Sequence, residues 1–139
     1  MNYSKEAIEK LTDFIHKDSA DTFNWLVNNG YTELAMLKDA VLGDGKSLEW
    51  LMRNKKIHLA AFVNAVREDT KAFDILFKLK VFHWAATANI INGDDKAAGW
   101  LKVNKLDHYI LLALVMKEKI RRDSDDDFNE SMMKVGSPF

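Results

Sequence analysis

The chain has 139 residues and no cysteine, and its 20 basic and 21 acidic side chains give a formal net charge of −1. This length predicts one domain with a real hydrophobic core, and the lack of cysteine excludes disulfides, thiolate zinc sites and cysteine nucleophiles. The near-neutral charge supplies no net field to attract nucleic acid, so we expect no nucleic-acid partner.

Targeting and membrane segments are not expected. Residues 1–9 are polar and charged and lack the apolar centre of a secretory signal peptide. The longest apolar run, residues 109–116, has eight residues, whereas roughly 20 are needed to cross a bilayer. We therefore predict a cytoplasmic protein without a membrane partner.

The sequence predicts an all-α protein. It contains one proline, Pro138, and six glycines, and no stretch shows the alternation of a half-buried strand. A first helix is expected over about residues 4–17, with Ser4 as its N-cap. Ser19 can cap the next helix, which ends near residues 28–30, because asparagine and glycine tolerate the conformation that closes a helix.

From residue 19 onward the sequence repeats with a period of 25 residues. Tryptophan occupies three of four equivalent positions (Trp25, Trp50 and Trp100), with Ile75 in the fourth, and a leucine follows each of them. Further ladders have the same offset: Asp44, Asp69 and Asp94; Lys46, Lys71 and Lys96; His58, His83 and His108; Asn29, Asn54 and Asn104. A fixed period in this range is typical of stacked units that cannot bury their apolar faces alone.

Each unit is predicted to contain two helices. The shorter ones span roughly residues 19–29, 44–54, 69–79 and 94–104, and the longer ones roughly 32–42, 57–67, 82–92 and 107–121. Connections of two or three residues force neighbouring helices to run antiparallel. The aspartate ladder precedes the short helices, where a carboxylate can accept unpaired backbone N–H groups. We therefore predict an α-solenoid of stacked antiparallel helical hairpins.

The predicted organisation is one domain in three parts. Residues 1–18 form an N-terminal capping helix, residues 19–121 form four hairpin repeats, and residues 122–139 form a C-terminal cap and a flexible tail. The helix that follows Leu106 is apolar around most of its circumference, although a terminal repeat normally needs a polar outer side. Two explanations are open: residues 125–133 fold back over it, or this face forms a homodimer.

The units resemble a shortened ankyrin repeat. The resemblance covers about residues 19–120 and rests on residues 59–61, on the His83-Trp84-Ala85-Ala86 stretch, on Gly93-Asp94 and on Trp100-Leu101. Ankyrin repeats have about 33 residues and a Thr-Pro-Leu-His start; here the period is 25, the Thr-Pro pair is missing and the connections are too short for a projecting finger. The resemblance implies a curved stack of helical hairpins that acts as a scaffold.

The histidine ladder is the first candidate site. His58, His83 and His108, with Glu33 in the equivalent position of the preceding unit, are expected to form a row across successive helices. Imidazole and carboxylate groups are ligands for zinc, nickel or iron, and they also contact polar small molecules. Each histidine lies in the first turn of a helix beside a large apolar residue, so a structural role within the hairpin is the competing and favoured interpretation.

Two other ladders have competing interpretations. Exposed tryptophans could anchor a peptide or stack on bases, but the apolar residues around each one favour a place in the core. Lysines could line a basic strip for an acidic partner, but each follows an aspartate by two residues, so a solvated surface is favoured. The lysines concerned are Lys46, Lys71 and Lys96.

Catalytic and calcium-binding motifs were also considered. Asp123, Asp125 and Asp127 match the first ligands of an EF-hand loop, but Phe128 and Lys134 occupy positions that need glycine and a carboxylate. The sequence contains no Gly-x-Ser-x-Gly motif, no His-Glu-x-x-His motif and no phosphate-binding glycine loop. We expect no catalytic residue, metal or cofactor.

The predicted function is a non-catalytic interaction module that binds a protein or peptide along its concave face. Two alternatives remain: a small-molecule or metal-binding protein that uses the histidine row, and an enzyme without a recognisable motif. The protein is expected to be a monomer or a homodimer formed through its C-terminal helix. The residues predicted to contact the partner are Glu33, His58, His83, His108, Lys46, Lys71 and Lys96.

Overall fold

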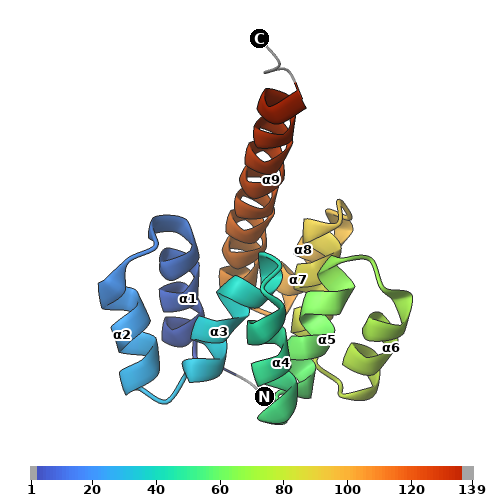
Figure 1. The fold of residues 1–139 in the computed structure, drawn as a ribbon. Helices are drawn as coiled ribbons and strands as arrows, with labels where there is room; N and C mark the ends of the chain where they lie inside the picture. The colour runs from blue at the N-terminus through green and yellow to red at the C-terminus, as the bar shows by residue number, and fades with distance from the viewer. Residues whose placement is uncertain (1–2, 136–139) are drawn as a thin grey trace.

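The structure is a computed structural model that describes the backbone of residues 3–135 and the side chains of residues 3–123. All regular structure in this range is helical, which confirms the all-α class (Figure 1). None of these helices is long and apolar enough to span a membrane. In chain order they are α1 (Lys5–Lys17), α2 (Ala20–Asn28), α3 (Thr32–Val41), α4 (Gly45–Arg53), α5 (Ile57–Val66), α6 (Thr70–Lys78), α7 (Phe82–Ile91), α8 (Lys96–Val103) and α9 (Asp107–Val135).

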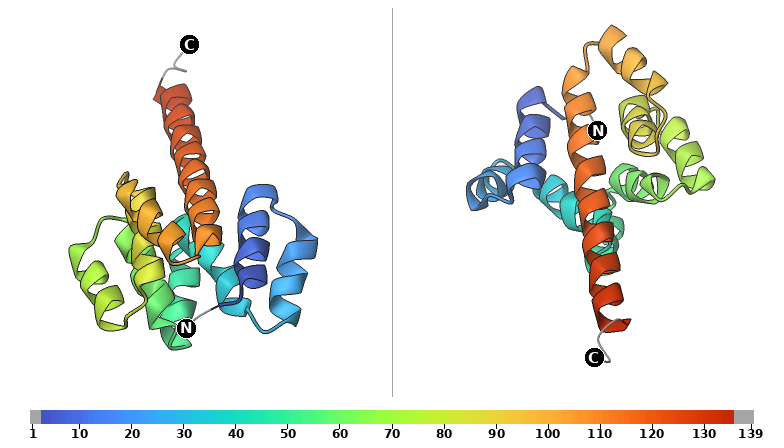
Figure 2. Two further views of the ribbon diagram at one scale, coloured as in Figure 1. Left: turned by 180° about the vertical axis from the view of Figure 1, so that it is seen from behind. Right: turned by 90° about the horizontal axis from the view of Figure 1, so that it is seen from above.

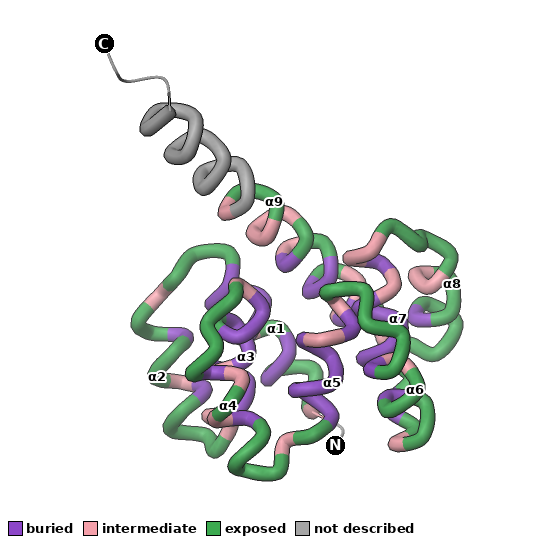
Figure 3. The backbone as a smooth tube through the Cα atoms, turned by 45° about the vertical axis from the view of Figure 1, so that its right-hand side comes forward, coloured by how far each residue is buried: buried purple, intermediate pink, exposed green. Residues whose placement is uncertain are grey.

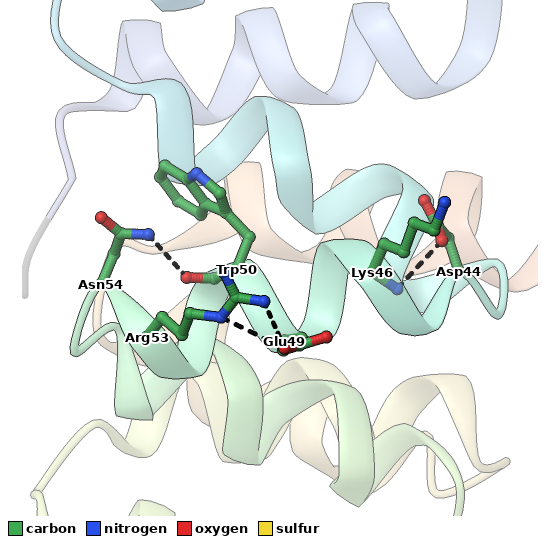
Figure 4. Close-up of polar contacts among 6 residues, drawn as sticks. All are labelled: Asp44, Lys46, Glu49, Trp50, Arg53 and Asn54. Carbon is green, nitrogen blue, oxygen red and sulfur yellow. Dashed lines mark hydrogen bonds and ion pairs between the residues drawn. The ribbon is translucent and has the colours of Figure 1, made fainter.

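The aspartate and asparagine ladders close the two ends of the short helices, as α4 illustrates (Figure 4). The Asp44 carboxylate accepts the backbone N–H of Lys46 at 3.1 Å, and the Asn54 side chain donates to the Trp50 carbonyl at 2.8 Å. The carboxylates of Asp69 and Asp94 accept the backbone N–H groups of residues 71 and 96 in the same way. The side chains of Asn29 and Asn104 likewise donate to the carbonyls of residues 25 and 100. The predicted capping role of the aspartates is therefore confirmed.

The helix that follows each short helix begins at a fixed distance from the end of that short helix. α3, α5, α7 and α9 begin at residues 32, 57, 82 and 107, in steps of 25 residues. The turn before each has a residue with positive φ, such as Gly30 (84°) or Lys80 (58°). The next N–H bonds back to the leucine of the ladder, as Val81 does to the Leu76 carbonyl at 3.1 Å. This is the Schellman arrangement, in which a left-handed residue ends one helix and sets the direction of the next.

The helices form an inner and an outer set (Figures 1 and 2). The inner helices α1, α3, α5, α7 and α9 each pack against the next, and α9 also packs against α1. The outer helices α2, α4, α6 and α8 each pack against two neighbouring inner helices. The first and last helices therefore lie side by side, and α1 is a partner of α9 instead of a cap at a free end.

Burial follows this division (Figure 3). The inner helices contribute most of the core, including the fully buried Phe62, Trp84 and Tyr109. The outer helices bury a narrow stripe, in which one leucine per helix is completely inaccessible: Leu26, Leu51, Leu76 and Leu101. The five inner helices form a ring, because each packs against the next and α9 packs against α1. The interior of this ring is filled with side chains.

The C-terminal helix differs from the expectation. We predicted a helix that ends near residue 121 and a separate short helix over residues 125–133, whereas α9 continues as one helix to Val135. The sequence between Leu106 and Val135 contains no glycine or proline that would stop a helix. The predicted packing of residues 125–133 over the core concerns side chains outside the described range, as does the predicted flexible tail at residues 136–139.

Candidate interaction site

The predicted histidine row lies inside the protein. Glu33, His58 and His83 occupy the first turns of adjacent inner helices and are only 8%, 6% and 8% exposed. His108, at the start of α9, is half-buried. The 25-residue period predicts that these residues are adjacent, and their burial agrees with the structural role favoured for the histidines. It leaves little of Glu33, His58 and His83 for a partner to contact.

Tyr3 supplies the row with a hydrogen-bond partner from outside the repeats. Its hydroxyl lies 2.9 Å from Nε2 of His58, and its ring stacks on the imidazole and meets Trp84 edge-on. Burial lowers the pKa of His58 to about 4 and raises the pKa of the Tyr3 hydroxyl, since both groups are held in their neutral forms. At the other end of the row, Lys56 pairs with Glu33 at 2.8 Å. These contacts give His58 and Glu33 structural partners.

The predicted lysines are not brought together with the histidine row. Lys46, Lys71 and Lys96 are exposed and lie at the starts of outer helices, whereas the row lies at the starts of inner helices. Because the two sets run antiparallel, these starts are at opposite edges of the molecule. In the described part of the chain, no three histidine or carboxylate side chains are placed to hold a metal ion.

An aromatic groove lies on the outer surface, between the α6–α7 hairpin and α8. Phe77, Phe82 and Trp100 are 49%, 42% and 43% exposed. The ring centroids of Phe77 and Phe82 are 5.9 Å apart, and those of Phe82 and Trp100 are 6.5 Å apart. The groove has a volume of about 570 Å³ and is lined by these three rings with Ala85, Ala86, Asn89, Asp94, Lys96 and Ala97.

The aromatic groove is only partly foreshadowed by the sequence pattern. The tryptophan ladder was expected to lie in the core, and Trp25 and Trp50 are indeed half-buried and packed against it. Trp100 is more exposed. The signal that could have been used is the pair Phe77 and Phe82, since two large aromatics on either side of a turn between antiparallel helices lie close together.

A second groove lies between α1 and α9, and we call it the seam groove. Its volume is about 590 Å³. Two leucines of α9 beside it are unusually accessible, Leu111 at 56% and Leu114 at 50%. Its lining comes from both helices: Lys5, Glu9, Thr12, Asp13, His16, Asp107, His108, Leu111 and Val115.

Comparison with known proteins found no matching family model, no matching curated protein and no matching solved structure.

Proposed function

We propose that the chain is an α-solenoid of antiparallel helical hairpins with a 25-residue period, and that it acts as a non-catalytic module that binds a peptide or protein segment. The observation that supports this function best is the aromatic groove, where three large rings are exposed around a floor of alanines. Aromatic side chains of this kind commonly supply most of the binding energy of a protein interface.

The chemistry of the groove favours an apolar side chain as the anchor of the partner. The side chains of Ala85, Ala86 and Ala97 end at Cβ, so the floor is shallow and apolar. An aliphatic or aromatic side chain seated there removes apolar surface of Phe82 and Trp100 from water, at about 25 cal/mol per Å² of buried area.

Four exposed lysines lie near the groove in sequence. Lys78, Lys80, Lys102 and Lys105 follow the exposed rings closely in sequence and are all exposed. Among the described residues, no ion pair engages any of them. Carboxylates that flank the anchor of the partner would therefore meet lysines that are not already neutralised, which favours encounter as well as register.

The proposed contact surface lies on the outside of the molecule, whereas the sequence predicts one on the concave face. The inner row cannot accept a peptide without displacing core side chains, because Glu33, His58 and His83 are buried and His58 is bonded to Tyr3. The same burial gives no support to a metal or small-molecule site at this row. A cytoplasmic location stays a prediction, as does a homodimer formed through α9.

The test is selection of peptides from a random library on the immobilised full-length protein, followed by titration of each selected peptide. The variant pair is Phe77→Lys with Phe82→Lys. The matched control is Met52→Lys with Ile57→Lys, because these residues occupy the same two positions one unit earlier and are similarly exposed.

We expect the selected peptides to bind the Phe77→Lys, Phe82→Lys variant at least about 10-fold more weakly than wild type, equivalent to about 1.4 kcal/mol. Their affinity for the control variant should be within about twofold of wild type. If selection yields no peptide that depends on Phe77 and Phe82, or if both pairs weaken binding equally, the groove is not the binding site.

A further inference from the structure

The seam groove is a position that other units of the protein cover with a helix. Leu111 stands 25 residues after Ala86 and 50 residues after Ala61, at the same place on successive inner helices. Ala61 and Ala86 are 4% and 6% exposed because α6 and α8 pack on α5 and α7, whereas Leu111 is 56% exposed. Leu111 is accessible because no outer helix of the described chain covers it, as α6 covers Ala61 and α8 covers Ala86.

The packing pattern points to the same place. α2, α4, α6 and α8 each lie against two neighbouring inner helices. α9 and α1 are neighbouring inner helices too, yet in the described chain no outer helix packs against both of them. Seen from above in Figure 2, α2 lies on the side of α1 away from α9, and α8 lies on the side of α9 away from α1. The seam groove therefore occupies a fifth outer position.

The four outer helices show what kind of helix covers such a pair. Each is eight or nine residues long. Each carries a small residue and, four positions later, a fully buried leucine, which places both on one face. The small residue allows close approach and the leucine fills the gap between two inner helices. The four pairs are Thr22 and Leu26, Ser47 and Leu51, Ala72 and Leu76, and Ala97 and Leu101.

The charges around the seam groove favour a basic occupant. Three carboxylates line it, from Glu9, Asp13 and Asp107, of which Glu9 pairs with Lys5 at 3.9 Å and Asp13 pairs with Lys17 at 3.4 Å. Burial lowers the pKa of His108, which also lines the groove. Asp107 makes no ion pair with the described residues. A lysine or arginine beside the apolar stripe of the occupant would meet it.

We infer that the seam groove binds an amphipathic helix of a partner protein that carries a small residue, a leucine four positions later and basic flanking residues. The partner helix takes the fifth outer position and covers Leu111. A second copy of this chain is a poorer occupant, because its four outer helices already bury the required stripe against their own inner helices. This inference does not depend on the aromatic groove.

The protein contains a ready probe for this helix. A labelled synthetic peptide with the sequence of residues 69–80 carries Ala72 and Leu76 at the required spacing and three lysines. It is titrated into the full-length protein by fluorescence anisotropy, and the contacted residues are identified from backbone NMR shifts. A peptide with Leu76→Asp is the control, because it keeps the length and the lysines but loses the buried leucine.

We expect saturable binding with shifts on α1 and α9, at least 10-fold weaker for the control peptide and for protein with Leu111→Lys and Leu114→Lys. Protein with Phe77→Lys and Phe82→Lys should bind the peptide as wild type does, which separates this result from the test of the aromatic groove. Since Leu111 and Leu114 are exposed, circular dichroism should show that their variants fold normally.

Three results would overturn the inference: no saturable binding, binding that is insensitive to the Leu111 and Leu114 pair, or shifts confined to α5 and α7, which would mean that the peptide replaces α6. A fourth is a concentration-dependent dimer in sedimentation equilibrium that the Leu111 and Leu114 pair abolishes, because the groove would then belong to an interface between two copies.

Discussion

At the scale of single residues, Tyr3 and His58 show how a polar group is accommodated in this core. The imidazole is 6% exposed, and the tyrosine hydroxyl at 2.9 Å provides the hydrogen bond that water would otherwise make. A neutral imidazole suits this contact, because its unprotonated ring nitrogen can accept a hydrogen bond from the hydroxyl. Among the described residues, Glu33 and Lys56 are charged groups that act on His58, and they pair with each other.

The stability of the protein should therefore depend on pH through His58. Its pKa is lowered from 6.5 to about 4 in the folded protein. Neutral His58 contributes fully to the free energy of unfolding above pH 6.5, and the contribution is lost as pH falls toward 4, because the unfolded chain takes up the proton first. Between pH 7 and pH 5 the loss should be about 2 kcal/mol.

Urea unfolding of the wild type and of His58→Gln at pH 7 and pH 5 measures this loss. We expect His58→Gln to lose about 2 kcal/mol less than the wild type over this interval. Asn24→Gln is the control, since Asn24 is an exposed, non-titrating residue of α2, and it should keep the wild-type dependence. Equal losses in wild type and His58→Gln would contradict the assignment.

At the scale of elements, the outer helices α4 and α6 begin by a different means from the inner helices α3, α5 and α7. The outer helices α4 and α6 have an aspartate N-cap whose carboxylate accepts a backbone N–H. The inner helices α3, α5 and α7 have no such side-chain cap and follow directly from a Schellman turn. Inner helices are held by burial on most sides, whereas an outer helix buries one stripe and depends more on its ends.

The N-cap of α6 should accordingly contribute measurable stability. Asp69 accepts the N–H of Lys71 at 3.0 Å. Asp69→Ala removes this bond and the favourable charge at the helix start, and should lower the free energy of unfolding by about 1 kcal/mol in urea titration. Asp74→Ala, an exposed site within the same helix, is the control and should change it by less than about 0.5 kcal/mol. Comparable losses at the two sites would argue against the capping role.

At the scale of the whole molecule, the contact between α1 and α9 joins the two ends of the helix array. In an open stack each unit contacts only its neighbours, so a change at one end is felt locally. Here Leu11 of α1 is completely buried. α1 packs against α2 and α3, which follow it in the chain, and also against the last helix, α9. The ends should therefore unfold together.

Leu11→Ala tests this coupling. It should lower the free energy of unfolding by about 2 to 5 kcal/mol and should reduce hydrogen-exchange protection in α8 and α9 as well as in α1 and α2. Leu26→Ala, at a buried leucine of α2, is the control and should reduce protection mainly in α1 to α3. Wild-type protection of α8 and α9 in Leu11→Ala would show that the two ends are energetically independent.

Features that depend on neighbours along the chain could be predicted from the amino-acid sequence. The period, the turn residues and the aspartates predicted the helical class and the helix starts to within a few residues, because capping, turn geometry and apolar spacing act over one or two turns. The continuation of α9 differs from the prediction, because the run of acidic residues from 123 to 127 contains no glycine or proline and therefore does not end the helix.

Which surfaces are available depends on how the helices pack in three dimensions, which the sequence pattern does not specify. The angle between successive units is set by how side chains pack across helices, and small angles accumulate until α9 meets α1. That closure fills the interior, buries Glu33, His58 and His83 and brings Tyr3 onto the row, so residues that looked like a binding row became part of the core. It also leaves the seam groove uncovered, because a ring built from five inner helices has five outer positions and the described chain fills four of them.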